Sequence, residues 1–253
     1  MHDSNDTLGS EDPLEHVAEY ERGLRESVFR KFVERPAVET LLPPLEGSRV
    51  LSVGTGPGYG AARLAERGAT VVGVDRDEDM CRYAAREYGD TVTVGRANPE
   101  RLPFDDDTFD VVVCRLALEL LPDLSLPVTE FSRVLSDNGV AVVSTEHPFT
   151  QYLSTAHGKK PMHGVVPKTR DVDYFETTGK LAYREDIDEL VEEDGYRRPL
   201  AATTGAFLDA GLCLTAVEEL GPTPAIAEQH AGFARHLRAE TPLYLCLRSG
   251  PRS

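Results

Sequence analysis

The fold of this chain is decided by the stretch Arg49–Asp75, RVLSVGTGPGYGAARLAERGATVVGVD. Its apolar start, Val50, Leu51 and Val53, is typical of a buried strand, and Ala61–Arg67 has the composition of a helix. A second apolar run follows and ends on an acid. A strand, a glycine-rich turn, a helix and a strand in this order predict a nucleoside-binding unit at the carboxyl edge of a parallel sheet.

The turn of this unit contains Gly54, Gly56, Gly58 and Gly60. A side chain at these positions would keep a ligand away from the backbone, and the helix that follows presents unpaired N–H groups to negative ligand atoms. Asp75 is placed where its carboxylate accepts hydrogen bonds from both ribose hydroxyls. Alternatively, the glycines only close a tight turn and Asp75 is a solvated strand end. Four alternate glycines together with the acid favour ligand binding.

The composition limits the kinds of partner. The chain has 253 residues, a net charge of −16 and 40% hydrophobic residues, enough for one domain with insertions or two small ones. A strongly acidic protein lacks the basic face that binds phosphate backbones, so we expect no nucleic acid partner. No apolar stretch approaches the ~18 residues of a membrane span, and the acidic N-terminus does not resemble a signal peptide. We therefore expect a soluble, cytoplasmic protein without membrane association.

The residue types that bind metals are scattered. Each of the four cysteines is far from the others and most are flanked by apolar residues: Cys81, Cys114, Cys213 and Cys246. This pattern indicates reduced core thiols rather than disulfides or a zinc site. His157 and His163 have no third ligand at a suitable spacing, so no metal is expected.

Strands and helices continue to alternate after Asp75. Further strands are predicted at Thr91–Val94, Phe109–Cys114, Val140–Thr145, Leu212–Leu220 and Leu243–Leu247. Helices are predicted around Met80–Ala85, over Leu124–Leu135 with an end at Asn138-Gly139, over Leu200–Ala210, and within Pro224–Glu240. This alternation predicts an α/β fold, with a parallel sheet and helices on both of its faces.

Three motifs in order make the chain similar to a known family. VLSVGTGPG (Val50–Gly58), VDRDEDM (Val74–Met80) and NPERLPFDDDTFDVV (Asn98–Val112) resemble the motifs of class I S-adenosylmethionine-dependent methyltransferases with a type 11-like domain. The resemblance covers about residues 45–146 well and continues more loosely to the end. It implies a Rossmann-like, seven-stranded, mostly parallel sheet whose last strand inserts antiparallel between the fifth and sixth.

The residue pattern and the resemblance together predict a domain organisation. Residues 1–12 are expected to form a mobile acidic tail, and residues 13–253 a single methyltransferase domain. Within that domain we expect an N-terminal helical cap (13–44), the cofactor-binding core (45–146), a substrate and lid insertion after strand five (147–198), and a helix and strands that complete the sheet (199–253).

The function implied by the resemblance is transfer of a methyl group from S-adenosylmethionine to an oxygen or nitrogen of a small-molecule acceptor, by in-line displacement. The residues implied to bind the cofactor are Gly54, Thr55, Gly56, Gly58, Asp75, Arg76, Met80, Asn98, Cys114 and Arg115. Asn98 replaces an aspartate that accepts from the adenine amino group. Cys114 and Arg115 would approach the methionine or its carboxylate. Both a monomer and a homodimer are compatible with the sequence.

Two departures from the family pattern keep alternatives open. Ser52 stands where the first motif usually has an acid, and Pro99 has no N–H to offer the adenine. A cofactor-binding but inactive regulatory protein is therefore one alternative. An NAD(P)-dependent oxidoreductase is another, because Gly56–Ala61 fits the pattern G-x-G-x-x-A. Against the oxidoreductase, no lysine follows a tyrosine by four residues, as short-chain dehydrogenases require.

Candidate substrate residues lie outside the motifs. His147 follows the fifth predicted strand and is the candidate general base, with a turn histidine that hydrogen-bonds the backbone as an equal alternative. Tyr20 is placed to cover the nucleoside site, although packing on the sheet is the commoner role for an aromatic residue. Tyr152 belongs to the polar insertion, and Tyr196 and Arg198 to a YxRPL element that follows the lid in similar methyltransferases.

Overall fold

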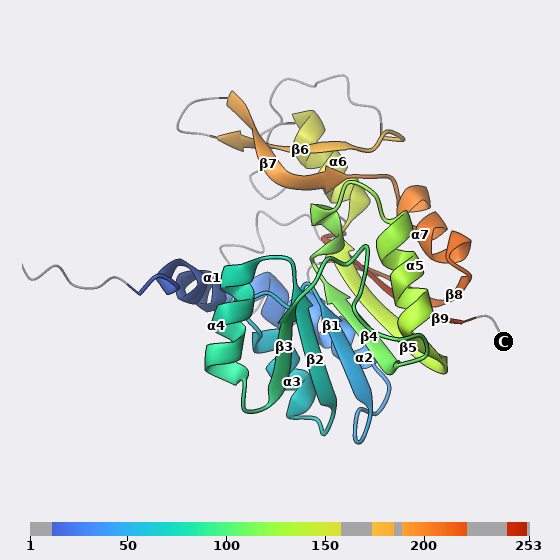
Figure 1. Cartoon of the computed structure of the whole chain (residues 1–253). Helices are drawn as coiled ribbons and strands as arrows, with labels where there is room; N and C mark the ends of the chain where they lie inside the picture. The colour runs from blue at the N-terminus through green and yellow to red at the C-terminus, as the bar shows by residue number, and fades with distance from the viewer. Residues whose placement is uncertain (1–11, 158–173, 185–188, 222–241, 252–253) are drawn as a thin grey trace, which may run out of the picture.

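The computed structural model describes residues 12–157, 174–184, 189–221 and 242–251, and a seven-stranded sheet forms its centre (Figure 1). The strand order is β3-β2-β1-β4-β5-β9-β8. The strands are β1 (Arg49–Val53), β2 (Thr70–Asp75), β3 (Val92–Arg96), β4 (Phe109–Arg115), β5 (Leu135–Glu146), β8 (Leu212–Leu220) and β9 (Tyr244–Pro251). Strands β1 to β5 are parallel, and β9 runs antiparallel to β5 and β8. The predicted fold class, including the inserted antiparallel strand, is confirmed.

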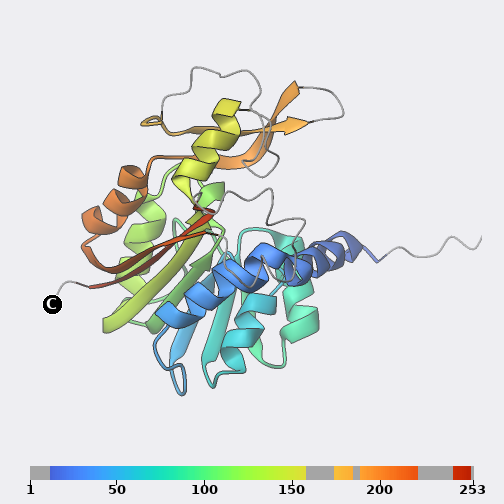
Figure 2. The same ribbon diagram turned by 180° about the vertical axis from the view of Figure 1, so that it is seen from behind.

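Helices cover both faces of this sheet (Figure 1 and Figure 2). The helices on one face are α2 (Arg35–Leu41), α3 (Tyr59–Ala65) and α4 (Glu78–Tyr88), and on the other α5 (Ser125–Val134) and α7 (Leu200–Asp209). Successive strand residues point to opposite faces, so Val50 packs with α2 and α3 while Leu51 packs with α5 and α7. Because both faces are buried, the strands are continuous apolar runs, which explains why the sequence predicts them well.

The N-terminal cap, residues 13–44, lies against α4 and the carboxyl edge of the sheet (Figure 2). It consists of α1 (Glu15–Glu26), the π-helical turn η1 (Arg30–Glu34) and α2. Val17 is fully buried and packs with Tyr83 of α4. Glu21, also buried, accepts hydrogen bonds from the hydroxyls of Tyr83 and Tyr88. These contacts fix the cap to the helix that follows β2.

The insertion after β5 has more regular structure than the sequence suggests. It contains α6 (Pro148–His157) and a hairpin of β6 (Thr178–Arg184) and β7 (Glu189–Arg197), which Figure 1 shows beyond the carboxyl edge of the sheet. Pro148 lies two residues after the end of β5 and begins α6, because the first helical position needs no N–H donor. The predicted helix within Pro224–Glu240 lies outside the described residues.

The boundary between α5 and β5 also differs from the prediction. Asn138-Gly139 was expected to end a helix, but α5 ends at Val134 and β5 begins at Leu135. Leu135 pairs with Phe109, and the register shifts before Val111 pairs with Val140. The Asn-Gly pair therefore lies within an irregular start of β5 and does not form the end of the helix.

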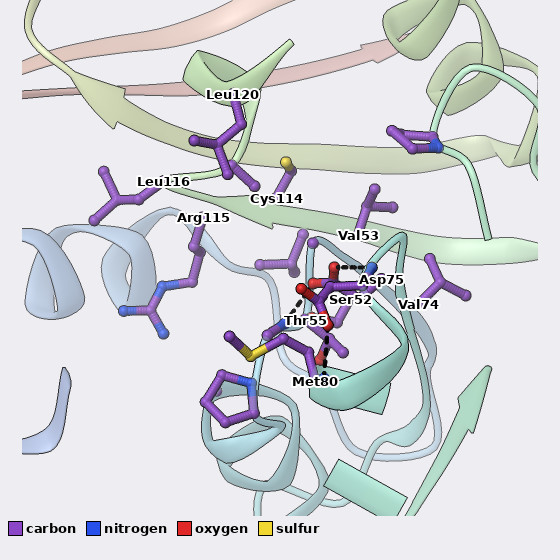
Figure 3. Close-up of a pocket in the computed structure, with 18 of the residues that line it drawn as sticks. Ser52, Val53, Thr55, Val74, Asp75, Met80, Cys114, Arg115, Leu116 and Leu120 are labelled. Atoms are coloured by element: carbon purple, nitrogen blue, oxygen red, sulfur yellow. Dashed lines mark hydrogen bonds between the residues drawn. The ribbon is translucent and has the colours of Figure 1, made fainter. Parts of the chain in front are cut away.

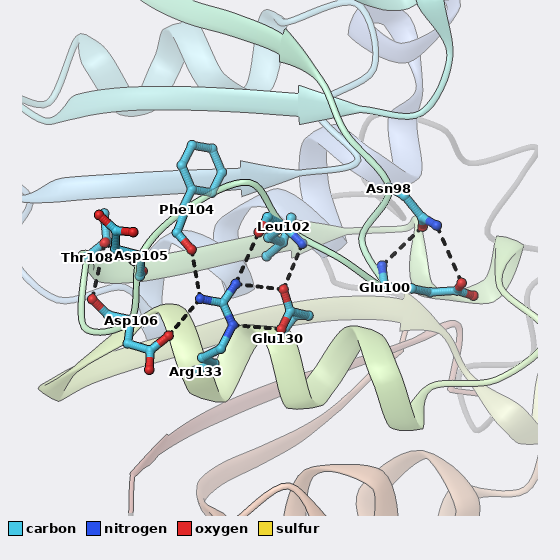
Figure 4. Close-up of polar contacts among 9 residues, drawn as sticks. All are labelled: Asn98, Glu100, Leu102, Phe104, Asp105, Asp106, Thr108, Glu130 and Arg133. Atoms are coloured by element: carbon cyan, nitrogen blue, oxygen red, sulfur yellow. Dashed lines mark hydrogen bonds and ion pairs between the residues drawn. The ribbon is translucent and has the colours of Figure 1, made fainter.

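Arg133 of α5 fixes the LPFDDDTFD segment to that helix (Figure 4). Its guanidinium donates to the carbonyl oxygens of Leu102 (3.1 Å) and Phe104 (2.7 Å) and to the carboxylates of Asp106 (2.8 Å) and Glu130 (2.7 Å). Glu130 in turn accepts from the N–H of Leu102 at 2.7 Å. This part of the third motif therefore has a structural role.

We expect Arg133→Met to lower the free energy of unfolding by about 2 kcal/mol, because hydrogen bonds to charged groups are lost while their partners stay partly buried. Urea unfolding measures the change. Arg82→Met is the control, since the Arg82–Asp79 ion pair is exposed and contributes about 0–1 kcal/mol. Equal losses in the two variants would contradict the role given to Arg133.

Candidate active site

A cavity of about 420 Å³ lies at the carboxyl ends of β1, β2 and β4 (Figure 3). Most of the residues predicted to bind the cofactor line it: Gly54, Thr55, Gly56, Asp75, Arg76, Met80, Cys114 and Arg115. Tyr20 from the N-terminal cap lines it too, as do Ser52 and Pro99, the two departures from the family pattern. The structure thus brings residues from three motifs and the cap to one cavity.

The glycine turn leaves the backbone open to this cavity. Gly54 and Gly56 have φ angles of +66° and +56°, a region that side chains rarely adopt. A Cβ on Gly56 would meet no atom within 4 Å, whereas one on Gly54 would lie 2.4 Å from the Cβ of Ala117. Gly58 does not line the cavity. A Cβ there would lie 2.8 Å from the Cβ of Ala84, so its absence lets α3 pack on α4.

Asp75 is held in one orientation by the backbone around it. Its Oδ2 accepts the N–H of Gly56 at 2.8 Å, and its Oδ1 accepts the N–H of Asp77 at 3.0 Å (Figure 3). The side chain of Asp77 caps α4 by accepting from the N–H groups of Asp79 and Met80. Each oxygen of the Asp75 carboxylate keeps a further lone pair. The carboxylate is therefore both fixed and able to accept hydrogen bonds from the cavity.

Arg115 reaches the cavity but is neutralised by Glu34. Its Nε donates to Glu34 Oε1 at 2.9 Å and its Nη2 donates to Oε2, while Ser144 Oγ donates to Oε1 at 2.6 Å. The Glu34 side chain is fully buried. Burial favours the neutral acid, but the hydrogen bonds and charge of Arg115 outweigh it, so the pKa of Glu34 lies below its ordinary value.

Cys114, the other residue at the end of β4, is a buried thiol. Burial raises its pKa, and the negative charges of Glu119 and Asp75 act in the same direction. The neutral thiol is therefore the form present at physiological pH, and it contributes an apolar part of the cavity wall.

Asn98 lies in a neighbouring cavity together with Tyr196. The two cavities share wall residues: Arg76, Ala97, Leu120 and Leu121. The Oδ1 of Asn98 accepts the N–H of Glu100 at 3.1 Å (Figure 4). The structure therefore places Asn98 next to the cofactor cavity rather than in its wall, and brings the YxRPL tyrosine close to it.

His147 is not among the residues that line the cofactor cavity. Its ring is buried: Nδ1 accepts the N–H of Phe149 at 3.2 Å, and Nε2 lies 2.8 Å from Glu219 Oε1. Both nitrogens are thus engaged, and the neutral ring, with its proton on Nε2, satisfies both contacts. Burial lowers the pKa of His147, and Glu219 opposes this. This geometry supports the interpretation of His147 as a turn histidine and gives no support to its role as a general base.

The pKa of His147 predicts a dependence of stability on pH. Since the folded state favours the neutral ring, protonation on acidification favours unfolding, and stability should fall as the pH decreases below 6.5, the ordinary value. We expect His147→Gln to weaken this dependence between about pH 5 and pH 8, the range in which histidine titrates. Thermal unfolding across that range tests it. If the variant were as acid-sensitive as the unmodified chain, another group would be responsible.

Two further predicted substrate residues, Arg198 and Tyr152, lie outside the cofactor cavity. Arg198 is buried and donates to the carbonyl oxygens of Leu118 and Leu121, at the ends of the 3₁₀ helix η2 (Leu118–Leu120). Because η2 forms part of the cavity wall, Arg198 positions that wall. Tyr152 lies with its ring 5.7 Å from that of Tyr174 and is not among the cavity-lining residues.

The cavity also contains residues that the sequence analysis did not select. Leu24, Arg30 and Arg35 of the N-terminal cap line it. Helical periodicity marks this segment as amphipathic, but periodicity alone does not show the π turn that orients Arg30 and Arg35. Across the described parts of the chain, no three His, Cys, Asp or Glu side chains gather as a metal site. In the same residues, no helix is long and apolar enough to cross a bilayer.

The residues present fit an S-adenosyl nucleoside: an open glycine backbone, a fixed carboxylate after β2 and an apolar wall from η2 surround one cavity. The fold and the site are similar to those of class I S-adenosylmethionine-dependent methyltransferase domains. In sequence comparison, residues 51–143 match the family model described as Methyltransferase domain.

Individual relatives agree with this assignment. A probable S-adenosylmethionine-dependent methyltransferase of Mycolicibacterium smegmatis is 33% identical over 66% of this chain and 58% of its own length. A malonyl-[acyl-carrier protein] O-methyltransferase of Geobacter sulfurreducens is 29% identical over 68% of this chain and 64% of its own. The chain thus spans less than two thirds of either relative.

Solved structures share the fold. A putative S-adenosylmethionine-dependent methyltransferase of Listeria monocytogenes superposes with a TM-score of 0.68 and 24% sequence identity. The likeness covers 87% of this chain and 97% of that one. It therefore extends beyond the segment matched by the family model to the strands that complete the sheet.

Proposed function

We propose that the protein transfers a methyl group from S-adenosylmethionine to an oxygen or nitrogen of a small-molecule acceptor. The observation that carries the proposal is the Asp75 carboxylate, held by the N–H groups of Gly56 and Asp77 at the edge of a cavity that the glycine turn leaves open. The carboxylate accepts from the ribose, and the Gly54–Gly56 backbone borders the methionine portion.

The proposed reaction makes few chemical demands on the protein. The donor supplies an activated methyl group, and holding a nucleophile in line with it can contribute about 7–11 kcal/mol through proximity and orientation. The wall of Leu118, Leu120 and Leu121 excludes water from one side of the cavity. Because positioning is sufficient for an acceptor that is already unprotonated, the proposal does not require His147 as a base.

The small size of the acceptor is inferred from the enclosure of the cavity, and the oxygen nucleophile from a relative. The cavity lies beneath the N-terminal cap and η2, and the chain's net charge of −16 opposes binding of a polyphosphate. The Geobacter relative is named for a methyl transfer to oxygen of a malonyl group. An oxygen nucleophile is compatible with that name, in which the malonyl group is attached to an acyl-carrier protein.

Ligand binding tests the proposal first. S-adenosylhomocysteine should raise the unfolding temperature of the protein, and NADH should not. Stabilisation by NADH alone would overturn the assignment. A screen of acceptors with a labelled methyl donor then tests turnover.

A second candidate function is a cofactor-binding protein without turnover. It is favoured by Ser52 and Pro99, which both line the cavity at positions where the family pattern has an acid and a residue with an N–H. Tight binding of S-adenosylhomocysteine with no methyl transfer to any acceptor of a broad panel would favour this candidate.

A further inference from the structure

Leu116 adopts a backbone conformation that is rare for a leucine. Its φ angle is +50°, in the left-handed region that bulky side chains seldom occupy. Asp107 also has a positive φ, but aspartate is among the residue types that tolerate this region. Leu116 comes directly after β4, and its N–H donates to the carbonyl oxygen of Ser144 at 2.8 Å. Strained residues that the surrounding structure holds in place cluster at ligand sites, so Leu116 is a candidate for ligand contact.

Leu116 belongs to a group of four apolar side chains that line the cofactor cavity without packing in the interior. The group, which we call the apolar rim, consists of Leu116, Leu120, Tyr20 and Leu24. None of them belongs to the hydrophobic clusters that the described residues form, whereas Leu118 of η2 does. Tyr20 and Leu120 are 48% and 38% exposed. Apolar surface that is left open at a cavity is typical of a ligand-binding wall.

The apolar rim and the polar groups of the cavity lie on different sides. In Figure 3, Leu116 and Leu120 lie on one side of the cavity, and Asp75 lies on another, beside Thr55. In the proposed complex the polar side, with Asp75 and the backbone of the glycine turn, binds the donor. The side chains of the rim carry a single polar atom, the hydroxyl oxygen of Tyr20. The rim therefore offers a ligand burial of apolar surface and few hydrogen bonds.

We propose that the apolar rim binds the methyl acceptor, and that the acceptor carries its nucleophilic oxygen or nitrogen on an uncharged, apolar skeleton. The inference rests on the proposed function, because it assumes that a donor nucleoside occupies the polar side of the cavity. The rim then receives the second molecule, since it adjoins the donor in the same cavity. Leu116 and Leu120 contact the skeleton from the end of β4, and Tyr20 and Leu24 contact it from the N-terminal cap.

The chemical step needs no further group at the rim. The nucleophile forms a bond to the methyl carbon, the carbon–sulfur bond breaks with its electron pair staying on sulfur, and the proton of the nucleophile passes to solvent. The rim contributes by holding the nucleophile in line with the methyl group.

The experiment measures how much the length of an apolar group contributes to binding. The probes are p-cresol, p-ethylphenol and p-propylphenol, which differ by one methylene each and keep the hydroxyl unchanged. They are titrated calorimetrically into the full chain saturated with S-adenosylhomocysteine, which lacks the transferable methyl group. Burial of a methylene at the rim should raise the affinity about two- to fourfold at each step of the series.

Leu116→Asn and Leu120→Asn test the two leucines of the rim. Asparagine tolerates a positive φ, so Leu116→Asn replaces the apolar contact by a polar one without adding backbone strain. We expect each variant to reduce the gain in affinity per methylene to less than about 1.5-fold and to keep the affinity for S-adenosylhomocysteine. If Leu116 served only to pack the fold, Leu116→Asn would lower the unfolding temperature and leave the gain per methylene unchanged, which would overturn the proposal.

Leu126→Asn provides the matched control. Leu126 is 57% exposed on α5 and does not line the cavity, so its substitution should keep the full gain per methylene. The acceptor site is overturned if the affinity does not rise with the length of the alkyl group, if the phenols displace S-adenosylhomocysteine, or if Leu126→Asn loses the gain as well. If the unmodified chain does not bind S-adenosylhomocysteine, the proposed function itself fails and the acceptor site falls with it, which is a different result.

Discussion

Asp75→Ala should weaken binding of S-adenosylhomocysteine at least about a hundredfold, the largest effect on affinity that we expect from a single substitution. In the proposed complex the carboxylate accepts from two ribose hydroxyls, and hydrogen bonds to a charged group contribute about 1.5–3 kcal/mol each. The substitution also removes the acceptor of the Gly56 N–H, which fixes the open turn. Calorimetric titration with S-adenosylhomocysteine measures the loss.

Asp75→Asn separates these two contributions. The amide keeps one oxygen and its size, so one backbone contact can persist while the charge is lost. We expect an intermediate weakening, about tenfold or more.

Asp110→Asn is the control for the loss of a carboxylate that accepts a hydrogen bond from a backbone N–H group. The Asp110 carboxylate accepts a hydrogen bond from the N–H of Arg49 at 2.8 Å. This contact lies at the amino ends of β1 and β4, opposite to the ends that form the cavity. Its substitution should leave affinity unchanged. An Asp75→Ala protein that binds S-adenosylhomocysteine as well as the unmodified chain would show that the sugar is held elsewhere.

The sequence identified the cofactor side of the cavity because the relevant residues follow strands. In a parallel sheet the carboxyl ends of neighbouring strands meet at one edge, so Gly54, Asp75 and Cys114 converge although they are far apart in the chain. The apolar runs of β1, β2 and β4 mark those ends clearly. Topology thus predicts this part of the site from local patterns.

The parts of the fold and of the site that were not predicted depend on contacts or backbone geometry that cannot be read from neighbouring residues in the sequence. His147 also follows a strand, but the side-chain contact with Glu219, 72 residues later, could not be read from its neighbours. The hairpin of β6 and β7 was missed because its residues are polar and lack the apolar runs of the central sheet. Arg30 and Arg35 were missed because a regular α-helix would place them on different faces, and only the π turn aligns them.

The Glu34–Arg115 pair should give the largest effect on stability. Glu34→Gln is expected to lower the free energy of unfolding by about 3 kcal/mol, which is the lower end of the range for breaking a buried ion pair. We expect the lower end because Arg115 also lines the cavity. The neutral amide cannot compensate the guanidinium, and it also weakens the contact with Ser144. This pair joins the N-terminal cap to β4 and β5, so its loss should loosen the cap from the sheet.

Glu39→Gln provides a control in the same cap. Glu39 also binds an arginine, Arg63, at 2.8 Å, but both side chains are more than a third exposed. Such surface pairs contribute about 0–1 kcal/mol, so the same chemical change should have a small effect. Chemical unfolding of the two variants side by side compares a buried with an exposed pair. Similar losses of unfolding free energy in the two variants would show that the burial of Glu34 does not determine the size of the effect.

The pKa of Glu34 adds a second, independent measurement. Because Arg115 holds the pKa of Glu34 in the folded state below the ordinary value of 4.5, the charged form favours folding. This stabilisation is present above about pH 4.5 and is lost as the pH falls through the folded-state pKa. In Glu34→Gln nothing titrates at this position, so the free energy of unfolding should fall less steeply below pH 4.5 than in the unmodified chain. Parallel curves would mean that the pair does not act through its charge.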